Sequence, residues 1–301
     1  MRVQQRRAYQ GGMLMRIVVR QIHGDSGIPI VIPVADADDA ITKRCLDNLE
    51  TCTSLPLKVY LVESLGDTFR WGMSMNAGIQ ASGQTGFVIG MDSDAFPKPG
   101  AIEKLIAFCQ SDPRLGYVGV KIINPTFVNL GWVDSGPIKY ALGAIKAKAP
   151  FFAVRRLVKG GWWLLGPGLV SKHKPGKMIG FSSTMFFLSR RCYTDIGPFD
   201  ERYRISFVDG DYAYRVLTSE KWFISTCPEV EVYHGLHSTQ YTGYYDKRIE
   251  KAWECGGLEY FRKDWPKERM KIVKKCAKEG KFIIHKAELS QIQSDRQHPK
   301  Q

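Results

Sequence analysis

Several motifs that define common ligand sites are missing from this chain of 301 residues. No G-x-G-x-x-G follows a predicted strand and no G-x-x-x-x-G-K-S/T occurs, so the dinucleotide fingerprint and the P-loop are excluded. H-E-x-x-H and G-x-S-x-G are also absent, which removes the usual zinc protease and serine hydrolase motifs. A ligand of this chain must therefore be held by other groups.

The chain also lacks a cysteine framework and a long apolar run. Its seven cysteines are scattered and contain no C-x-x-C pair, which argues against disulfides and against a zinc ribbon. The most apolar stretch, residues 160–170, is about half as long as a bilayer crossing requires. Near the N-terminus the apolar residues are split by Arg16, which makes a poor signal peptide. These features predict a cytoplasmic protein.

Acidic residues are scarce in two parts of the chain. Residues 1–24 hold five arginines and no acid, and residues 135–194 hold eleven basic residues and no acid. Overall, 43 basic residues stand against 30 acidic ones, which gives a net charge of +13, while an apolar share of 44% is typical of a globular protein. The basic excess indicates an anionic partner: nucleic acid, a phosphorylated substrate or a membrane surface.

Strand-like and helix-like patterns alternate through the first half of the chain. Short apolar runs predict buried strands, and helical periodicity or small residues predict helices between them. We expect strands at 28–34, 57–62, 86–91 and 117–123, and helices at 39–52, 69–81 and 99–110. Further along we expect regular structure at 178–188, a helix at 210–219, and strands at 222–226 and 229–233. The alternation predicts a doubly wound α/β sheet.

Two carboxylates, Asp92 and Asp94, follow the third predicted strand. Ligands of open α/β sheets bind at the carboxyl ends of the strands. Two carboxylates separated by one residue can converge there on Mg²⁺ or Mn²⁺, which favour a few carboxylates together with substrate phosphates. The alternative is a solvated turn, because Asp is a common turn residue.

Nine short segments occur in an order that is typical of one enzyme family. They are PIVIPV (29–34), CLDNL (45–49), VES (62–64) with Asp67, NAGI (76–79) with Ala81, DSDAFPKPG (92–100), Gly180 with MFFLSRR (185–191), IGPFDE (196–201), DGD (209–211) with Arg215, and VYH (232–234) with Ser238. Together they resemble the family 2 glycosyltransferases, which have the GT-A fold. The sequence departs from the family pattern at Glu63, where Asp is usual, at Val208, where an acid is usual, and in the turn Ala35-Asp36.

The resemblance implies an α/β fold of the Rossmann-like GT-A type, with a mixed central sheet flanked by helices. The chain would then divide into a basic N-terminal extension (1–24), a catalytic domain (25–240) and a basic, helical C-terminal tail (241–301). Within the domain, residues 25–130 would be the nucleotide-sugar-binding half, and 178–240 the half with the acceptor site and the catalytic base. Residues 131–177, rich in aromatic and basic side chains, would be an insert or lid.

The implied activity is inverting transfer of a sugar from a nucleotide-diphosphate donor to a hydroxyl of a glycan, lipid-linked or protein-linked acceptor. Asp92, Asp94 and His234 would hold Mn²⁺ or Mg²⁺, although His234 can equally be an ordinary histidine at a strand end. Asp209 is the first candidate for the catalytic base and Asp211 the second. Asp211 can instead fix the geometry by pairing with Arg215, four residues on, and both acids also suit a plain helix N-terminus.

The donor-binding residues implied by the resemblance lie at strand ends and in the turns after them. They are Pro33, Ala35, Asp36, Glu63, Asp67, Arg70, Asn76, Asp92 and Ser93. The basic and aromatic insert is typical of acceptor contact or of an anionic bilayer surface. A peripheral position on the cytoplasmic membrane face is therefore a further hypothesis.

Three other functions remain as alternatives. A non-catalytic nucleotide- or carbohydrate-binding module on the same fold would not need Asp94 and Asp209 together. A nucleic-acid-binding protein is disfavoured, because no recognised binding motif occurs and the basic stretches flank acidic turns. A nucleotidylyltransferase would need a Gly-rich, basic loop after the first strand, and that turn is acidic.

Overall fold

A computed structural model describes residues 3–123, 128–129, 184–219, 221–234, 247–254, 257–276 and 282–283. The strands are β1 (Val3–Gln10), β2 (Met13–Ile22), β3 (Ile28–Val34), β4 (Leu57–Ser64), β5 (Phe87–Met91), β6 (Ala95–Pro97), β7 (Leu115–Ile123), β8 (Val128–Asn129), β9 (Met185–Ser189), β10 (Phe223–His234) and β11 (Phe282–Ile283). The helices are α1 (Ala40–Cys52), α2 (Trp71–Ala81), α3 (Ala101–Gln110), α6 (Arg190–Ile196), α7 (Val208–Thr218), α9 (Lys247–Glu254), α10 (Leu258–Asp264) and α11 (Lys267–Cys276).

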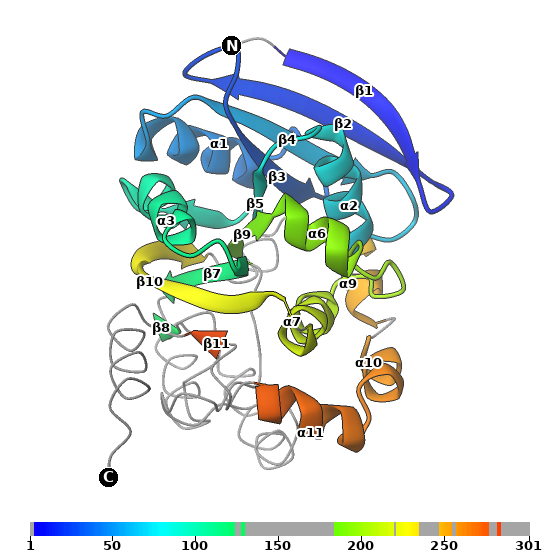
Figure 1. Cartoon of the computed structure of the whole chain (residues 1–301). Coiled ribbons are helices and arrows are strands. Elements are labelled where there is room, and N and C mark those ends of the chain that lie inside the picture. Colours follow the sequence, from blue (N-terminus) through cyan, green and yellow to red (C-terminus); the bar gives the residue numbers. More distant parts are fainter. Residues whose placement is uncertain are drawn as a thin grey trace.

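The described strands form one mixed sheet in the order β1-β2-β4-β3-β5-β9-β7-β10-β11 (Figure 1). Strands β4, β3 and β5 are parallel neighbours, and so are β7 and β10. Strand β9 lies antiparallel between β5 and β7. The predicted mixed sheet flanked by helices is confirmed. The strands expected at 222–226 and 229–233 are one strand, β10, which has a register shift between Cys227 and Glu231.

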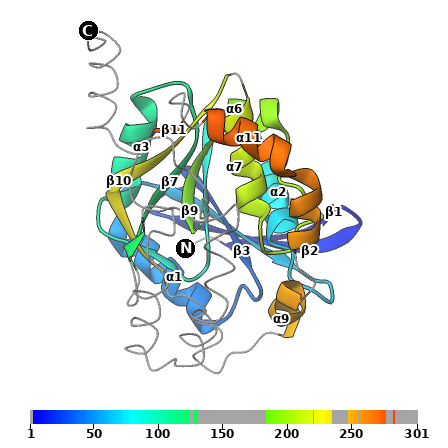
Figure 2. The ribbon, with the colours of Figure 1, turned by 90° about the horizontal axis from the view of Figure 1, so that it is seen from below.

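Helices cover the two faces of the sheet (Figure 2). Helices α1 and α3 pack on one face through apolar residues at helical spacing, such as Cys45 and Leu49 of α1 and Ile102 and Leu105 of α3. Helices α2, α6 and α7 pack on the other face. Because both faces are covered, the central strands read as nearly continuous apolar runs, and this is why the sequence predicts them well.

Residues 1–24 were expected to precede the domain, but the structure places strands β1 and β2 inside the sheet. Strand β2 pairs antiparallel with β4, and β1 pairs antiparallel with β2. Met15, Ile17 and Val19 alternate along β2 and are buried in the same core as α2. Arg16 lies on the opposite face of β2, which also carries Val18 and Ile22, two residues buried in the second core with α1.

The described helices of the interval 241–301 also contribute to the core. Ala252 of α9, Phe261 of α10 and Val273 of α11 are buried in the cluster that contains α2 and α7. Trp265, directly after α10, meets Tyr214 of α7 edge-on, with 5.2 Å between the ring centroids. These apolar residues are few among many lysines and arginines. The sequence alone therefore predicts helical structure here but not its contact with the domain.

The expected insert at 131–177 lies outside the described residues. No helix within the described ranges is long and apolar enough to cross a membrane.

Candidate active site

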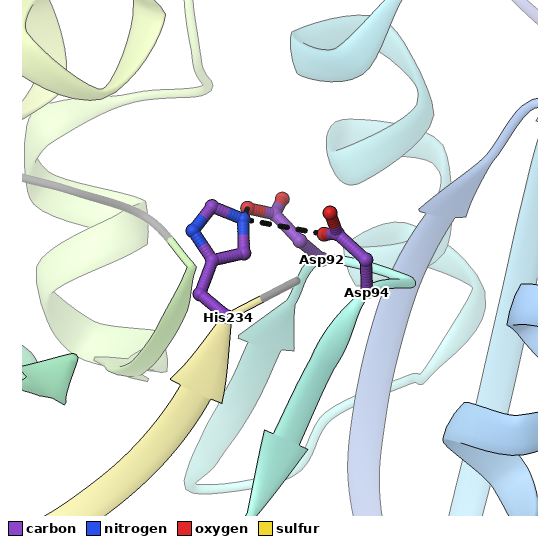
Figure 3. Close-up of side chains that lie close together, drawn as sticks. All are labelled: Asp92, Asp94 and His234. Carbon is purple, nitrogen blue, oxygen red and sulfur yellow. Dashed lines mark ion pairs between the residues drawn. The ribbon is translucent and has the colours of Figure 1, made fainter. Parts of the chain in front are cut away.

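The side chains of Asp92, Asp94 and His234 converge where β5 and β10 end (Figure 3). Each offers one ligand atom, and these atoms all lie within 4.8 Å of one another. His234 Nε2 lies 3.2 Å from Asp94 Oδ1 and 3.8 Å from Asp92 Oδ2. The three side chains are between 17% and 25% exposed, so the cluster is open to a ligand. Two carboxylates and one imidazole form a donor set that fits Mn²⁺ or Mg²⁺.

Local pairing explains why these residues meet although they lie far apart in the sequence. The short strand β6 pairs antiparallel with the end of β10 and sets Ala95 opposite His234, which brings Asp94 next to the imidazole. The Asp92 backbone N–H donates to the Thr184 carbonyl at 2.9 Å. The Thr184 hydroxyl lies 3.4 Å from His234 Nδ1. Thr184 thus helps to orient the ring, with Nε2 toward the carboxylates.

Burial and the neighbouring charges change the pKa values of the side chains in the cluster. Burial raises the pKa of Asp92 to about 7, and the charges of Asp94 and Asp209 add to the rise, while His234 and a hydrogen bond from Trp71 oppose it. At His234, burial favours the neutral ring, but Asp94 and Asp92 outweigh this effect and raise its pKa. The cluster without a cation therefore holds protons near neutral pH, and a cation would displace them.

Trp71 is a site residue that the sequence analysis missed. From the first turn of α2, its indole Nε1 donates a 2.9 Å hydrogen bond to Asp92 Oδ1. The ring is buried and meets Phe199 edge-on, with 5.5 Å between the centroids. Trp71 therefore fixes one oxygen of Asp92 from a rigid position. No spacing in the sequence connects residue 71 with the turn at 92.

Asp209 lies in the first turn of α7, close enough to the cluster for its charge to raise the pKa of Asp92. Burial raises the pKa of Tyr117, and Asp209 and Asp92 both add to that rise. Phe207, just before the helix, has φ of 69°, which is rare for a residue with a side chain, and it stacks on Phe261 at 5.0 Å. The strained start of α7 thus sets Asp209 near Asp92.

Asp211, the second candidate base, is engaged in the fold. Its side chain is buried, Oδ2 accepts a 2.9 Å bond from Arg215 Nε, and Oδ1 accepts a 2.8 Å bond from Trp265 Nε1. The expected pair with Arg215 is confirmed. Asp211 also lines a cavity of about 410 Å³ that Asp92, Asp94, Asp209 and His234 do not line. The two neighbouring acids therefore face different surroundings.

Four of the predicted donor-binding residues lie at the adjacent ends of β3 and β4. Pro33 pairs with Val62, and Val34 pairs with Glu63, so that Ala35 and Asp36 follow directly beside Glu63. Glu63 is only 8% exposed. The sheet therefore brings this part of the predicted set together.

Two basic residues that the sequence analysis missed reach the same strand ends. Arg16 of β2 forms an ion pair with Glu63, with 2.6 Å between Nη2 and Oε2. Arg248 of α9 donates to the carbonyl of Ser64 at 3.1 Å and to the carbonyl of Ala35. Both residues lie on elements that the sequence reading had set outside the domain or in a tail.

Asp67, Arg70 and Ser93 occupy the turns around this region. Asp67 is exposed and forms an ion pair with Lys251 of α9, which lowers the pKa of the carboxyl. The Arg70 backbone N–H donates to Ser64 Oγ at 3.2 Å, and Arg70 lines a cavity of about 430 Å³ beside the β1–β2 turn. Ser93 lies between the two carboxylates of the cluster and is partly buried.

Asn76, by contrast, is not on the donor side. Its side chain is fully buried; Nδ2 donates to the Phe199 carbonyl at 2.8 Å, and Oδ1 accepts from the Phe199 N–H at 2.9 Å. Nδ2 also donates to Glu201 and Oδ1 also accepts from the Tyr193 hydroxyl. The prediction that Asn76 contacts the donor therefore does not agree with the structure, since the amide holds the loop at 198–201 instead.

We expect Asn76→Ala to lower the free energy of unfolding by about 3 kcal/mol, because it leaves the buried N–H and carbonyl of Phe199 without these partners. Denaturant unfolding measures the loss. Ser111→Ala, which removes one hydrogen bond from a side chain to the Phe108 carbonyl, is the control and should cost about 1 kcal/mol. A weaker affinity for nucleotide with unchanged stability would contradict this assignment.

The sequence profile described as Glycosyl transferase family 2 matches residues 31–195, which is more than half of the chain. The chain therefore belongs to glycosyl transferase family 2. A mixed sheet with helices on both faces is the architecture expected of its GT-A fold. The matched segment contains Asp92 and Asp94 but ends before Asp209 and His234.

Among solved structures, residues 1–349 of TarS from S. aureus are similar with a TM-score of 0.41 and 11% identity, over 72% of this chain and 63% of that chain. Epoxide hydrolase VrEH1 from Vigna radiata follows with a TM-score of 0.23 and 12% identity, over 82% of this chain and 87% of that chain. A search of curated proteins finds no match to this chain. The family assignment rests on the sequence match at 31–195.

Proposed function

We propose that this protein is a metal-dependent, inverting glycosyltransferase. It would move a sugar from a nucleotide-diphosphate donor to a hydroxyl of a glycan, lipid-linked or protein-linked acceptor. One observation supports the proposal above all: Asp92, Asp94 and His234 converge, with the charge of Asp209 close by, at strand ends where open α/β sheets bind ligands.

Asp92, Asp94 and His234 are the residues that would hold Mn²⁺ or Mg²⁺. The bound cation would neutralise the negative charge that builds on the leaving diphosphate. Trp71 and Thr184 keep Asp92 and His234 in place through the hydrogen bonds described above.

Asp209 is the proposed general base. A carboxylate oxygen of Asp209 takes the proton of the acceptor hydroxyl while the acceptor oxygen bonds to the anomeric carbon. The bond between that carbon and the diphosphate oxygen breaks on the opposite face, which inverts the configuration. Asp36, Glu63, Asp67 and Arg70 are proposed to contact the nucleoside and diphosphate, together with Pro33, Ala35 and Ser93.

A thermal-shift screen of nucleotide sugars, with and without Mn²⁺, tests the proposal. We expect one donor to raise the melting temperature only when Mn²⁺ is present, because the diphosphate and the protein share the cation. The anomeric configuration of the transferred sugar, read by NMR, then tests inversion. A shift without turnover on any acceptor would favour the non-catalytic module, and no shift with any donor would contradict donor binding.

The stabilisation by Mn²⁺ is expected to grow from about pH 6 to about pH 8. Asp92, with its pKa raised to about 7, and His234, with its pKa also raised, must both lose their protons before they can bind a cation. Below that range protons compete with Mn²⁺, and above it they do not. Melting temperatures at both pH values, each with and without Mn²⁺, give the difference. An equal or smaller shift at the higher pH would contradict the assignment of the ligands.

A further inference from the structure

Arg16 brings three carboxylates together at the ends of β3 and β4. Its Nε and Nη2 atoms lie 2.8 Å and 2.6 Å from Glu63 Oε2. Nη2 also lies 3.3 Å from Asp38 Oδ2 and 3.7 Å from Asp36 Oδ1. Arg16 belongs to β2, ahead of the segment 31–195 that matches the family, so this contact comes from outside the matched segment.

The backbone register makes the pair of Arg16 and Glu63 specific. The two residues are directly opposite each other in the antiparallel pairing of β2 with β4. Without the guanidinium, the buried Glu63 would face Asp36 and Asp38, whose side chains are exposed, with no positive charge between them, and Glu63 would lose the group that fixes its rotamer. Arginine suits this task better than lysine, because its planar group donates to several acceptors at once.

The strand pairing itself does not need Arg16. The β2–β4 ladder runs from Met15 to Ile22, and Met15, Ile17 and Val19 are buried beneath α2. Arg16 is instead 25% exposed, and both of its bonds to Glu63 end on Oε2. Within the described residues, the other oxygen, Oε1, has no hydrogen bond. Arg16 thus holds Glu63 in one orientation and leaves an acceptor oxygen for another molecule.

We propose that Arg16 is a positioning residue for the nucleoside of the donor. It holds Glu63, and with it Asp36, so that carboxylate oxygens can accept hydrogen bonds from N–H groups of the base or from ribose hydroxyls. This site would bind the nucleoside of the donor through its N–H groups and ribose hydroxyls. The diphosphate of the same molecule would lie at the Asp92–Asp94–His234 cluster. The inference rests on the proposed function and adds a residue that acts through Glu63.

The test separates the nucleoside end from the diphosphate end. Calorimetry with Mn²⁺ first finds which of UDP, GDP, CDP, ADP and dTDP the wild-type protein binds best. The same nucleotide and pyrophosphate are then titrated into Arg16→Gln. We expect the affinity for the nucleotide to fall at least about tenfold, since a charge-assisted contact is lost, and the affinity for pyrophosphate to change less than about twofold.

Three further variants sharpen the result. Arg7→Gln removes the same charge from the exposed position opposite Arg16 on β1 and should change neither affinity. Arg16→Lys keeps the charge but loses the planar geometry and should fall between wild type and Arg16→Gln. In a Glu63→Gln background, Arg16→Gln should cost little more, because the two residues act as one unit.

Several outcomes would overturn the inference. The first is that Arg16→Gln binds the nucleotide as tightly as the wild type does. The second is that Arg16→Gln loses as much affinity for pyrophosphate as for the nucleotide. The third is that Arg16→Gln lowers nucleotide affinity as much in the Glu63→Gln background as in the wild type. A failure of Arg16→Gln to fold would assign the residue to the fold and would overturn it too. A wild-type protein that binds none of the five nucleotides contradicts the proposed function itself, whereas normal wild-type binding with an unaffected variant contradicts only the inference about Arg16.

Discussion

Asp209→Asn should abolish sugar transfer and leave the affinity for the donor nearly intact. The amide cannot take a proton from the acceptor hydroxyl, and loss of a general base lowers rates by about 10²–10⁴-fold. The proposed donor contacts are Asp92, Asp94 and residues at the ends of β3 and β4, and Asp209→Asn replaces none of these side chains. Single-turnover transfer rates and donor titrations with Mn²⁺ separate the two effects. The Asp209 charge is one of the smaller causes that raise the pKa of Asp92, so its removal should change Mn²⁺ affinity by no more than a few-fold.

Asp211→Asn is the matched comparison, because it makes the same chemical change two residues away. Asp211 is buried between Arg215 and Trp265, and its loss of charge leaves Arg215 without its carboxylate partner. We expect a lower free energy of unfolding, by about 2–4 kcal/mol, and a modest change in the transfer rate of the protein that remains folded. If Asp211→Asn, and not Asp209→Asn, abolished transfer in a stable protein, the assignment of the base would be reversed.

The sequence predicted the fold where one short stretch contains its own signal. Strand β3 is an apolar run followed by turn residues, and α1 begins with the Asp39 cap and continues at helical spacing. Asp92 and Asp94 are separated by one residue in the chain and follow a buried strand, so their position at a strand end could be predicted. His234 could be added only through the resemblance, because its approach depends on the pairing of β6 with β10.

The residues that the sequence did not reveal all act across long separations. Trp71 contacts Asp92, Arg16 contacts Glu63, and Arg248 spans the carbonyls of Ala35 and Ser64. None of these contacts leaves a periodic pattern. The hairpin also lacked a clear sequence signal, because Arg16 and Arg20 share one face of β2 with the buried Val18 and Ile22. The arginines therefore interrupt an apolar strand that is buried on both faces, and the charge of residues 1–24 conceals the strand.

The β1–β2 hairpin and α9 both contact the ends of β3 and β4. The β1–β2 hairpin precedes the segment that matches the family and α9 follows it, and each sends an arginine to the ends of β3 and β4. The two contacts differ in kind, since Arg248 binds backbone carbonyls and Arg16 binds carboxylates. Arg248 thus links the backbones of the two strand ends, while Arg16 orients the acidic side chain of Glu63.

Asp94→Asn is expected to abolish metal-dependent donor binding. The variant loses one of two carboxylates in the cluster and the closest partner of His234 Nε2, at 3.2 Å. Because changes to groups that merely support a metal ligand already cost about 10–100-fold in affinity, loss of a ligand itself should weaken Mn²⁺ binding by at least about 100-fold. Calorimetric Mn²⁺ titration measures this loss directly, and transfer activity should fall with it.

The metal-free Asp94→Asn protein should at the same time differ little in stability from the wild type, and this second readout separates a metal site from a structural ion pair. Removing the Asp94 charge relieves the repulsion that helps to raise the pKa of Asp92, which stabilises the ionised form of Asp92. The same change removes the partner that helps to raise the pKa of His234, and this loss offsets the gain. Asp47→Asn makes the same substitution on the exposed side of α1 and should leave Mn²⁺ affinity and melting temperature unchanged. A large loss of stability in Asp94→Asn with unchanged Mn²⁺ affinity would mean that the cluster serves the fold, and the proposed catalytic scheme would then lose its cation.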